Sequence, residues 1–158
     1  MATYNRTATG GGTAGHPANA AVPYVITSPV WDTADGGTGG DIVQLVDVPA
    51  DTMIVAGCLE VLEAAGNGQV TLDIGFTGGD VDTFMDGSPL AAGFSPFLEA
   101  SIGASGSNCR MLTSADTIDA LILDGGSSGE SACRFRIHVC MVDVSKNPVE
   151  SATVSTGT

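Results

Sequence analysis

The densest group of carboxylates in the sequence lies in a glycine-flanked segment, where Asp80, Asp82 and Asp86 fall within seven residues. Calcium ions bind oxygen ligands of this kind, so the segment is a weak candidate for a Ca²⁺ site. Its spacing does not match the EF-hand loop, which places a bidentate glutamate at its last position. Aspartate also forms turns by hydrogen bonding to nearby backbone N–H groups. We expect turn formation here and no bound metal.

A second group alternates with apolar residues near the C-terminus. Arg134, Arg136, His138 and Cys140 therefore share one face of a predicted strand. This face could be a cationic binding stripe or a Cys/His metal site, or it could pack against an acidic neighbouring strand. We favour the acidic neighbour, because the sequence identifies no second strand of metal ligands. The other histidine, His16, lies in a segment of small residues and could serve as a ligand or an anchor.

No set of residues in the sequence has the pattern of an active site. Glycine clusters at 10–12, 36–40 and 125–129 lack the GxGxxG and GK[ST] patterns. No predicted helix follows them to supply a phosphate-binding N-terminus. The acid pair Asp116 and Asp119 is expected to be solvated at a sheet edge. We expect a protein that is not an enzyme and needs no cofactor.

Charge excludes several classes of partner. The 158 residues include 5 Lys and Arg against 18 Asp and Glu, which gives a net charge of −13. Twelve acids and no base fall between Arg6 and Arg110, so nucleic acid and anionic membranes would be repelled. The longest apolar run is too short to span a membrane, and no secretory signal opens the sequence. The widely spaced cysteines fit reduced thiols in a protein made in a cytoplasm: Cys58, Cys109, Cys133 and Cys140.

Short apolar runs separated by Gly, Asp, Asn, Ser and Pro clusters indicate strands and no helix. We expect an all-β protein with an antiparallel β-sandwich, most simply a jelly roll of about eight strands. Pro23 and Pro29 confine the first strand to a sheet edge or to bulges. Alternation over residues 69–76 predicts one buried face and one solvated face. The strands are predicted at residues 22–31, 41–48, 52–62, 69–76, 81–85, 109–113, 117–123 and 132–144.

The predicted domain spans residues 22–144. An extended N-terminal arm at 1–21 and a C-terminal tail at 145–158 flank it, and both consist mainly of small residues. Such arms can lie along another subunit by main-chain hydrogen bonding. A long loop is predicted at 86–108, and a loop of that length in a compact domain is usually functional. These features favour a protein that works within an assembly.

Three stretches, at 41–52, 66–75 and 79–87, together with Leu59 to Val61, resemble small virion structural proteins of tailed bacteriophages, especially head decoration (cement) proteins. The resemblance covers about residues 41–90 and rests on strand and turn patterns. It implies a β-sandwich that forms a homotrimer on the outside of the phage head and bridges subunits of the major capsid protein. It also implies synthesis in the host cytoplasm and no active site.

On this resemblance, we expect contacts to the capsid or to other subunits from Tyr4, Arg6 and His16 in the arm and from Phe94 and Phe97 in the loop. Trp31 is either a buried anchor or an ordinary core residue. The alternative is a carbohydrate- or receptor-binding β-sandwich module of a phage fibre or tail. Sugar platforms need exposed Trp and Tyr side chains, and the chain has one Trp and two Tyr, which favours the decoration protein.

Overall fold

The computed structural model describes residues 22–32, 40–64, 70–76, 81–97, 110–123 and 133–145. Six of the predicted strands are confirmed to within two residues at each end, namely those at 41–48, 52–62, 69–76, 109–113, 117–123 and 132–144. The described strands are β1 (Pro23–Thr27), β2 (Trp31–Asp32), β3 (Ile42–Val48), β4 (Thr52–Glu63), β5 (Thr71–Phe76), β6 (Met85–Pro89), β7 (Gly93–Pro96), β8 (Arg110–Leu112), β9 (Asp116–Leu123) and β10 (Arg134–Asp143). The described part of the chain holds no helix long and apolar enough to cross a membrane.

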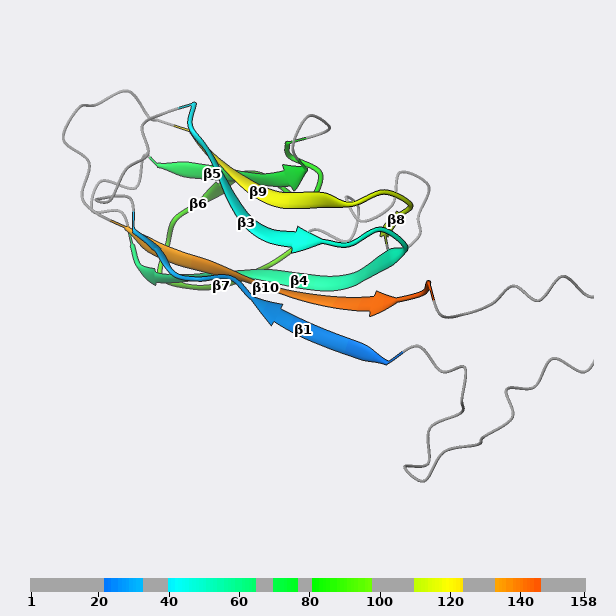
Figure 1. Cartoon of the computed structure of the whole chain (residues 1–158). Coiled ribbons are helices and arrows are strands. Elements are labelled where there is room, and N and C mark those ends of the chain that lie inside the picture. Colours follow the sequence, from blue (N-terminus) through cyan, green and yellow to red (C-terminus); the bar gives the residue numbers. More distant parts are fainter. Residues whose placement is uncertain are drawn as a thin grey trace, which may run out of the picture.

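The strands form two antiparallel sheets that face each other (Figure 1). Sheet A has the order β1-β10-β4-β7, with the short strands β2 beside β10 and β8 beside β4. Sheet B has the order β3-β9-β5-β6. When the short strands β2 and β8 are left out, each connection between consecutive strands leads from one sheet to the other, except the β5–β6 hairpin within sheet B. This is the strand order of an eight-stranded jelly roll, so the predicted fold class is confirmed.

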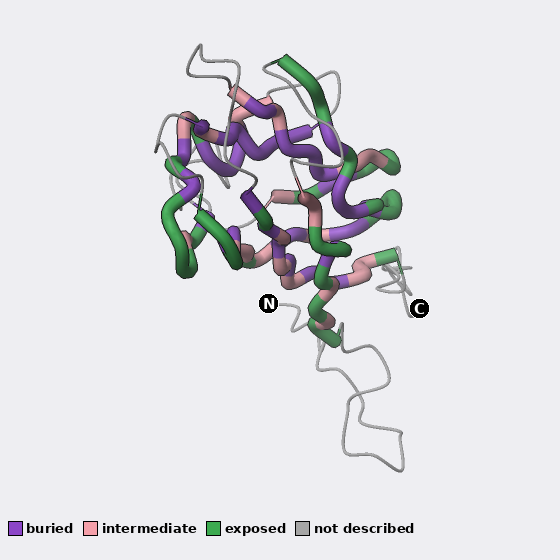
Figure 2. Tube along the Cα trace, turned by 90° about the vertical axis from the view of Figure 1, so that its left-hand side faces the viewer, coloured by how far each residue is buried: buried purple, intermediate pink, exposed green. Residues whose placement is uncertain are grey.

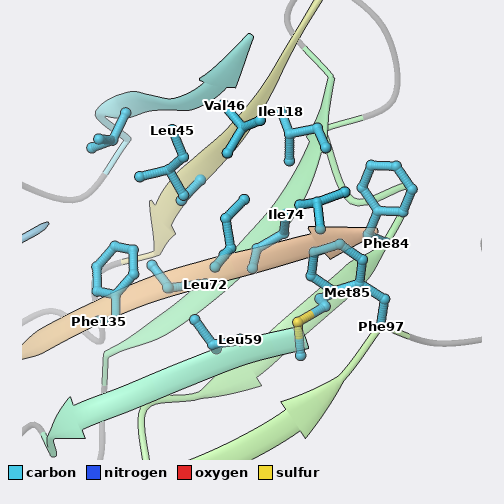
Figure 3. Close-up of a cluster of buried hydrophobic side chains, with 14 of the residues drawn as sticks. Leu45, Val46, Leu59, Leu72, Ile74, Phe84, Met85, Phe97, Ile118 and Phe135 are labelled. Atoms are coloured by element: carbon cyan, nitrogen blue, oxygen red, sulfur yellow. The ribbon is translucent and has the colours of Figure 1, made fainter. Parts of the chain in front are cut away.

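A single hydrophobic core lies between the sheets, where buried positions gather in the interior of the molecule (Figures 2 and 3). Strand β10 shows why the sequence folds this way, because its inward residues Phe135, Ile137, Val139 and Met141 are all fully buried. They alternate with more polar residues that point outward, as the two-residue period of a strand requires. Sheet B supplies the facing layer with Leu72, Ile74, Ile118, Ala120 and Ile122.

Aromatic side chains close one end of this core (Figure 3). The Phe84 ring meets Phe76 edge-on, with ring centroids 5.0 Å apart. On its other side it stacks on Phe97, also at 5.0 Å, with an interplanar angle of 21°. Gly57 on β4 leaves room for the Phe97 ring, since a Cβ atom at that position would overlap it. The core therefore depends on one missing side chain as well as on the large ones.

Strand β5 departs from its prediction. Leu72, Ile74 and Phe76 are buried as expected, but Asp73 and Gly75 on the other face are also buried. The strand is internal to sheet B and is hydrogen-bonded to β9 on one side and to β6 on the other. The Asp73 carboxylate accepts a hydrogen bond from the backbone N–H of Gly87, with Oδ1 and N 2.7 Å apart. The solvated face predicted for residues 69–76 is therefore wrong, because a satisfied acceptor can be buried.

The segment after β5 also differs from expectation. Residues 81–84 form turns, and the strand predicted at 81–85 begins only at Met85, as β6. The loop predicted at 86–108 contains β7 and most of β6. Glycines with positive φ, Gly87 at +58° and Gly93 at +127°, lie in these strands. Because β6 and β7 are short and contain glycine and proline, their sequences show little alternation of polar and apolar residues. Their pairing, β6 with β5 and β7 with β4, defines them as strands.

The first strand is an edge strand, as its prolines predicted. The predicted run 22–31 is divided into β1 and β2, which pair in turn with β10. Between them, buried Ser28 accepts a hydrogen bond from Ile137 N at its Oγ and donates its own N–H to Ile137 O, both at 3.0 Å. Pro23 lies opposite Val142, so β1 begins where β10 ends (Figure 1). The arm at 1–21 and residues 146–158 of the tail lie outside the described residues.

Candidate interaction surface on sheet A

The outward-pointing side chains of sheet A form a surface that we call the outer face of sheet A. Register defines it, because residues paired across antiparallel strands point to the same side. One row joins Val25, Cys140 and Ala56. The next row joins Thr27, His138, Cys58 and Pro96. The third joins Arg136, Glu60 and Phe94, and at the end of β10 a fourth joins Val142, Met53 and Met111.

An ion-pair network lies at the centre of this face. Oε2 of Glu60 lies 2.5 Å from Nε of Arg136 and 2.9 Å from Nε2 of His138. Hydrogen bonds from Arg136 and then from His138 lower the pKa of the Glu60 carboxyl below its ordinary value, although burial opposes them. At the edge, Nε of Arg134 lies 3.9 Å from Oδ2 of Asp32. The structure thus confirms the interpretation of the 134–140 stripe as a face packed against acidic neighbours.

The histidine and the thiols on this face do not make a metal site. Both ring nitrogens of His138 are engaged, because Nδ1 lies 2.8 Å from Thr27 Oγ1 and Nε2 bonds Glu60. Burial, together with the nearby negative charge of Glu60, raises the pKa of the Cys58 thiol above its ordinary value, which disfavours the thiolate that binds metals. In the described residues, no group of three His, Cys, Asp or Glu side chains could hold a metal ion.

The two phenylalanines predicted as contact residues have different environments. Phe94 on β7 is 68% exposed and its ring lies 6.3 Å from the His138 ring. Phe97, just past the end of β7, is 3% exposed and belongs to the core. Its backbone N–H bonds the Gly57 carbonyl at 2.9 Å. Only Phe94 is available to a partner in this structure, and Phe97 fixes the end of its strand.

The remaining predicted site residues divide into those inside and those outside the described residues. Tyr4, Arg6, His16 and Asp80 lie outside. Asp82 lies in a turn, and Asp86 is exposed on β6. Trp31 on β2 is half-buried, packs on the edge of the core and has its Nε1 buried without a hydrogen-bond partner in the described residues. Trp31 is thus a partly buried core residue and does not form an exposed aromatic platform.

Charge and exposed apolar side chains are distributed unequally between the sheets, which the linear sequence did not reveal. The described arginines, Arg110, Arg134 and Arg136, all lie on strands of sheet A. The strands of sheet B carry no Lys or Arg and five aspartates, at 47, 73, 86, 116 and 119, of which Asp73 and Asp119 are buried. The solvated sheet-edge position predicted for Asp116 and Asp119 is therefore wrong for Asp119, because β9 lies inside the sheet between β3 and β5. Of the described large apolar side chains that are exposed, Ile42 alone belongs to a strand of sheet B, whereas Val25, Leu62, Phe94 and Met111 belong to sheet A.

A small open cleft of about 220 Å³ lies beside β8, away from the ion-pair network. The Arg110 guanidinium lies over the Phe76 ring, 5.7 Å from its centroid. The lining adds Met111, Leu112, Thr113, Ser114 and Asp116, and the Asp116 carboxylate accepts a hydrogen bond from Thr117 N at 2.8 Å. No histidine or cysteine of the described residues lines the cleft, so the lining does not suggest a nucleophile with a base.

Comparison with known proteins agrees with this fold. No family model and no curated protein matches the sequence. A chain in the capsid asymmetric unit of cyanophage Pam1 is 13% identical with a TM-score of 0.62, and the match covers 90% of this chain and 99% of that one. The acidic stable capsid of Helicobacter pylori bacteriophage KHP30 gives 14% identity, a TM-score of 0.57 and coverage of 78% and 90%. The capsid of Ralstonia phage GP4 gives 19% identity, a TM-score of 0.52 and coverage of 76% and 84%. This chain therefore has the same fold as chains in three phage capsid structures.

Proposed function

We propose that this protein is a non-enzymatic structural protein of a bacteriophage virion that decorates the head. It binds the outer surface of the capsid, stabilises the lattice of the major capsid protein and does so as a homotrimer. The observation that carries this proposal is the likeness to chains of three phage capsid structures, which extends over 76% to 90% of this chain. A shared fold does not by itself fix function, so the proposal also draws on the charge of the protein.

The charge of the protein supports an exterior position. A net charge of −13 opposes contact with packaged nucleic acid, because phosphates are neutralised by Lys and Arg. The strands of sheet B have no base, and their aspartates Asp47, Asp86 and Asp116 are at least partly exposed, which suits a surface that faces solvent. Many weak contacts that form only with the assembled lattice would stabilise that lattice by linkage.

We assign the contacts to two regions. The N-terminal arm supplies Tyr4, Arg6 and His16, in a segment with no acidic residue. The β7 edge supplies Phe94 directly, whereas Phe97 acts indirectly because it anchors the end of that strand. The arm leads into β1 at the end of sheet A where Pro23 pairs with Val142. Phe94 lies toward the other end of the sheet, in the row with Glu60 and Arg136, so the two contact regions are at opposite ends of sheet A.

Binding to purified heads tests the proposal. The full-length protein is mixed with expanded heads that lack it and sedimented, and the melting temperature of the heads is followed. We expect saturable co-sedimentation and a higher melting temperature. No binding to heads from the phage that encodes the protein would overturn the proposal. Glycan binding that is lost on Trp31→Ala would instead favour the carbohydrate-binding module, although the half-buried position of Trp31 weighs against it.

A further inference from the structure

We propose that copies of the chain associate with one another through the outer face of sheet A. The proposal deepens the self-association part of the proposed function by naming the surface, and it is independent of how the arms contact the capsid. The occupant is a second copy of this chain. Exposed apolar side chains, charge balance and available area support it.

Apolar side chains that face water gather on this sheet. Val25 is 65% exposed, Phe94 68% and Met111 46%, and all three point outward by register. They come from β1, β7 and β8, which flank the central pair β10 and β4. Large anchors such as phenylalanine, when covered by a partner, commonly provide much of the binding energy.

The charged groups between these apolar side chains are already paired within the sheet. Glu60 bonds both Arg136 and His138, and Arg134 lies beside Asp32. Covering this centre would therefore not leave an unpaired charge in the interface, which is the costly case. The half-buried Cys58 and Cys140 lie next to the network and add weakly polar surface.

Charge also identifies the occupant. The outer face of sheet A carries both signs of charge, with Arg134 beside Asp32 and Arg136 beside Glu60, so a second copy meets no excess of either sign there. The strands of sheet B carry no base, and three of their aspartates, Asp47, Asp86 and Asp116, are at least partly exposed. Contact between the sheet B surfaces of two copies would bring like charges together, which suppresses association. In an acidic protein, the balanced sheet is the one through which copies of the chain can meet.

The area of the face is adequate. The six strands of sheet A hold 36 residues, and at about 3.3 Å per residue with strands about 4.8 Å apart they give a footprint of roughly 570 Å². Stable protein interfaces bury about 800 Å² of accessible surface per partner. Projecting side chains make the accessible surface larger than the flat footprint, so an interface of standard size would use the whole face.

Sedimentation velocity of the purified full-length protein over a concentration series tests this inference. Phe94→Glu and Val25→Glu each place a carboxylate on the proposed interface, and Ile42→Glu is the matched control on sheet B, where Ile42 is 50% exposed. We expect the wild type and Ile42→Glu to form the same oligomer. The two sheet A variants should dissociate about ten-fold more readily or worse. Circular dichroism verifies that each variant is folded.

Thiol alkylation provides a second readout that needs no substitution. Cys58 and Cys140 should be protected in the oligomer and become reactive on dilution to monomers, as measured by mass spectrometry. A monomeric wild type, or an oligomer that dissociates with Ile42→Glu but not with Phe94→Glu, would overturn the inference. A monomeric wild type that still binds heads would overturn it without touching the decoration role.

Discussion

Glu60 on β4 binds Arg136 on β10 across the centre of sheet A, with Oε2 and Nε 2.5 Å apart. The two residues are 76 positions apart in the sequence, and the pair joins the longest strands of the sheet. Because His138 bonds the same oxygen, one carboxylate ties together two side chains of a single strand face. The stripe of bases on β10 is therefore held in place by an acid from its neighbour.

This network makes the stability of the protein depend on pH. The folded-state pKa of Glu60 lies below its ordinary value, so its stabilising contribution is complete above the unfolded pKa of about 4.3. That contribution is lost as the pH falls through the folded pKa. We expect Glu60→Gln to lower the free energy of unfolding at pH 6 and to have a progressively smaller effect as the pH falls below the unfolded pKa. Urea titrations of both proteins at each pH measure this, and a difference that grows on acidification would contradict it.

The two loop phenylalanines should differ sharply in their effect on stability. Phe97→Ala removes a ring buried against Phe84 and should lower the free energy of unfolding by about 3–5 kcal/mol. Phe94→Ala removes an exposed ring and should change it by about 0.5 kcal/mol or less. Urea unfolding at a matched, low protein concentration compares the two. An equal loss of unfolding free energy in both variants would contradict the assignment of Phe97 to the core and Phe94 to the surface.

Gly57 should be intolerant of even one methyl group. The Cβ atom of Gly57→Ala would overlap the Phe97 ring, so we expect a loss of about 1–3 kcal/mol from overpacking. In the background of Phe97→Leu, which removes the ring, the added cost of Gly57→Ala should be smaller. Such non-additivity is expected of residues in contact. Thermal or urea unfolding of the four proteins gives the coupling energy, and strictly additive costs would rule out this packing explanation.

Deletion of residues 1–20 should separate attachment from folding. Residues 1–20 are mainly small and polar and have no hydrophobic period, so we expect the melting temperature of the truncated protein to match that of the full chain. We expect occupancy on heads to fall, because the arm carries Tyr4, Arg6 and His16. Quantitative gel analysis of sedimented heads measures occupancy, and full-length protein with all three residues changed to alanine tests the side chains alone. Unchanged occupancy after the deletion would end the arm proposal.

Much of the architecture could be predicted from local patterns, because the two-residue alternation of a half-buried strand is written in the sequence. Residues 134–141 show this alternation throughout, and the structure buries every second side chain. The prediction failed where strands are short or buried on both faces. β6 and β7 contain Gly, Ser and Pro, which have low strand propensity. Asp73 looks solvent-facing in the sequence, but the N–H of Gly87 satisfies its carboxylate inside the fold.

The sequence by itself determined the all-β class, the acidic surface and the alternation that separates core from exterior, because these depend on composition and near neighbours. Only the tertiary structure decided which strands pair and which side chains lie together on one face of a sheet. It separated Phe94 from Phe97, paired Arg136 and His138 with Glu60, and collected the described arginines on sheet A. These outcomes follow from strand pairing between distant segments, which depends on the packing energy of the whole sandwich and leaves no local signal.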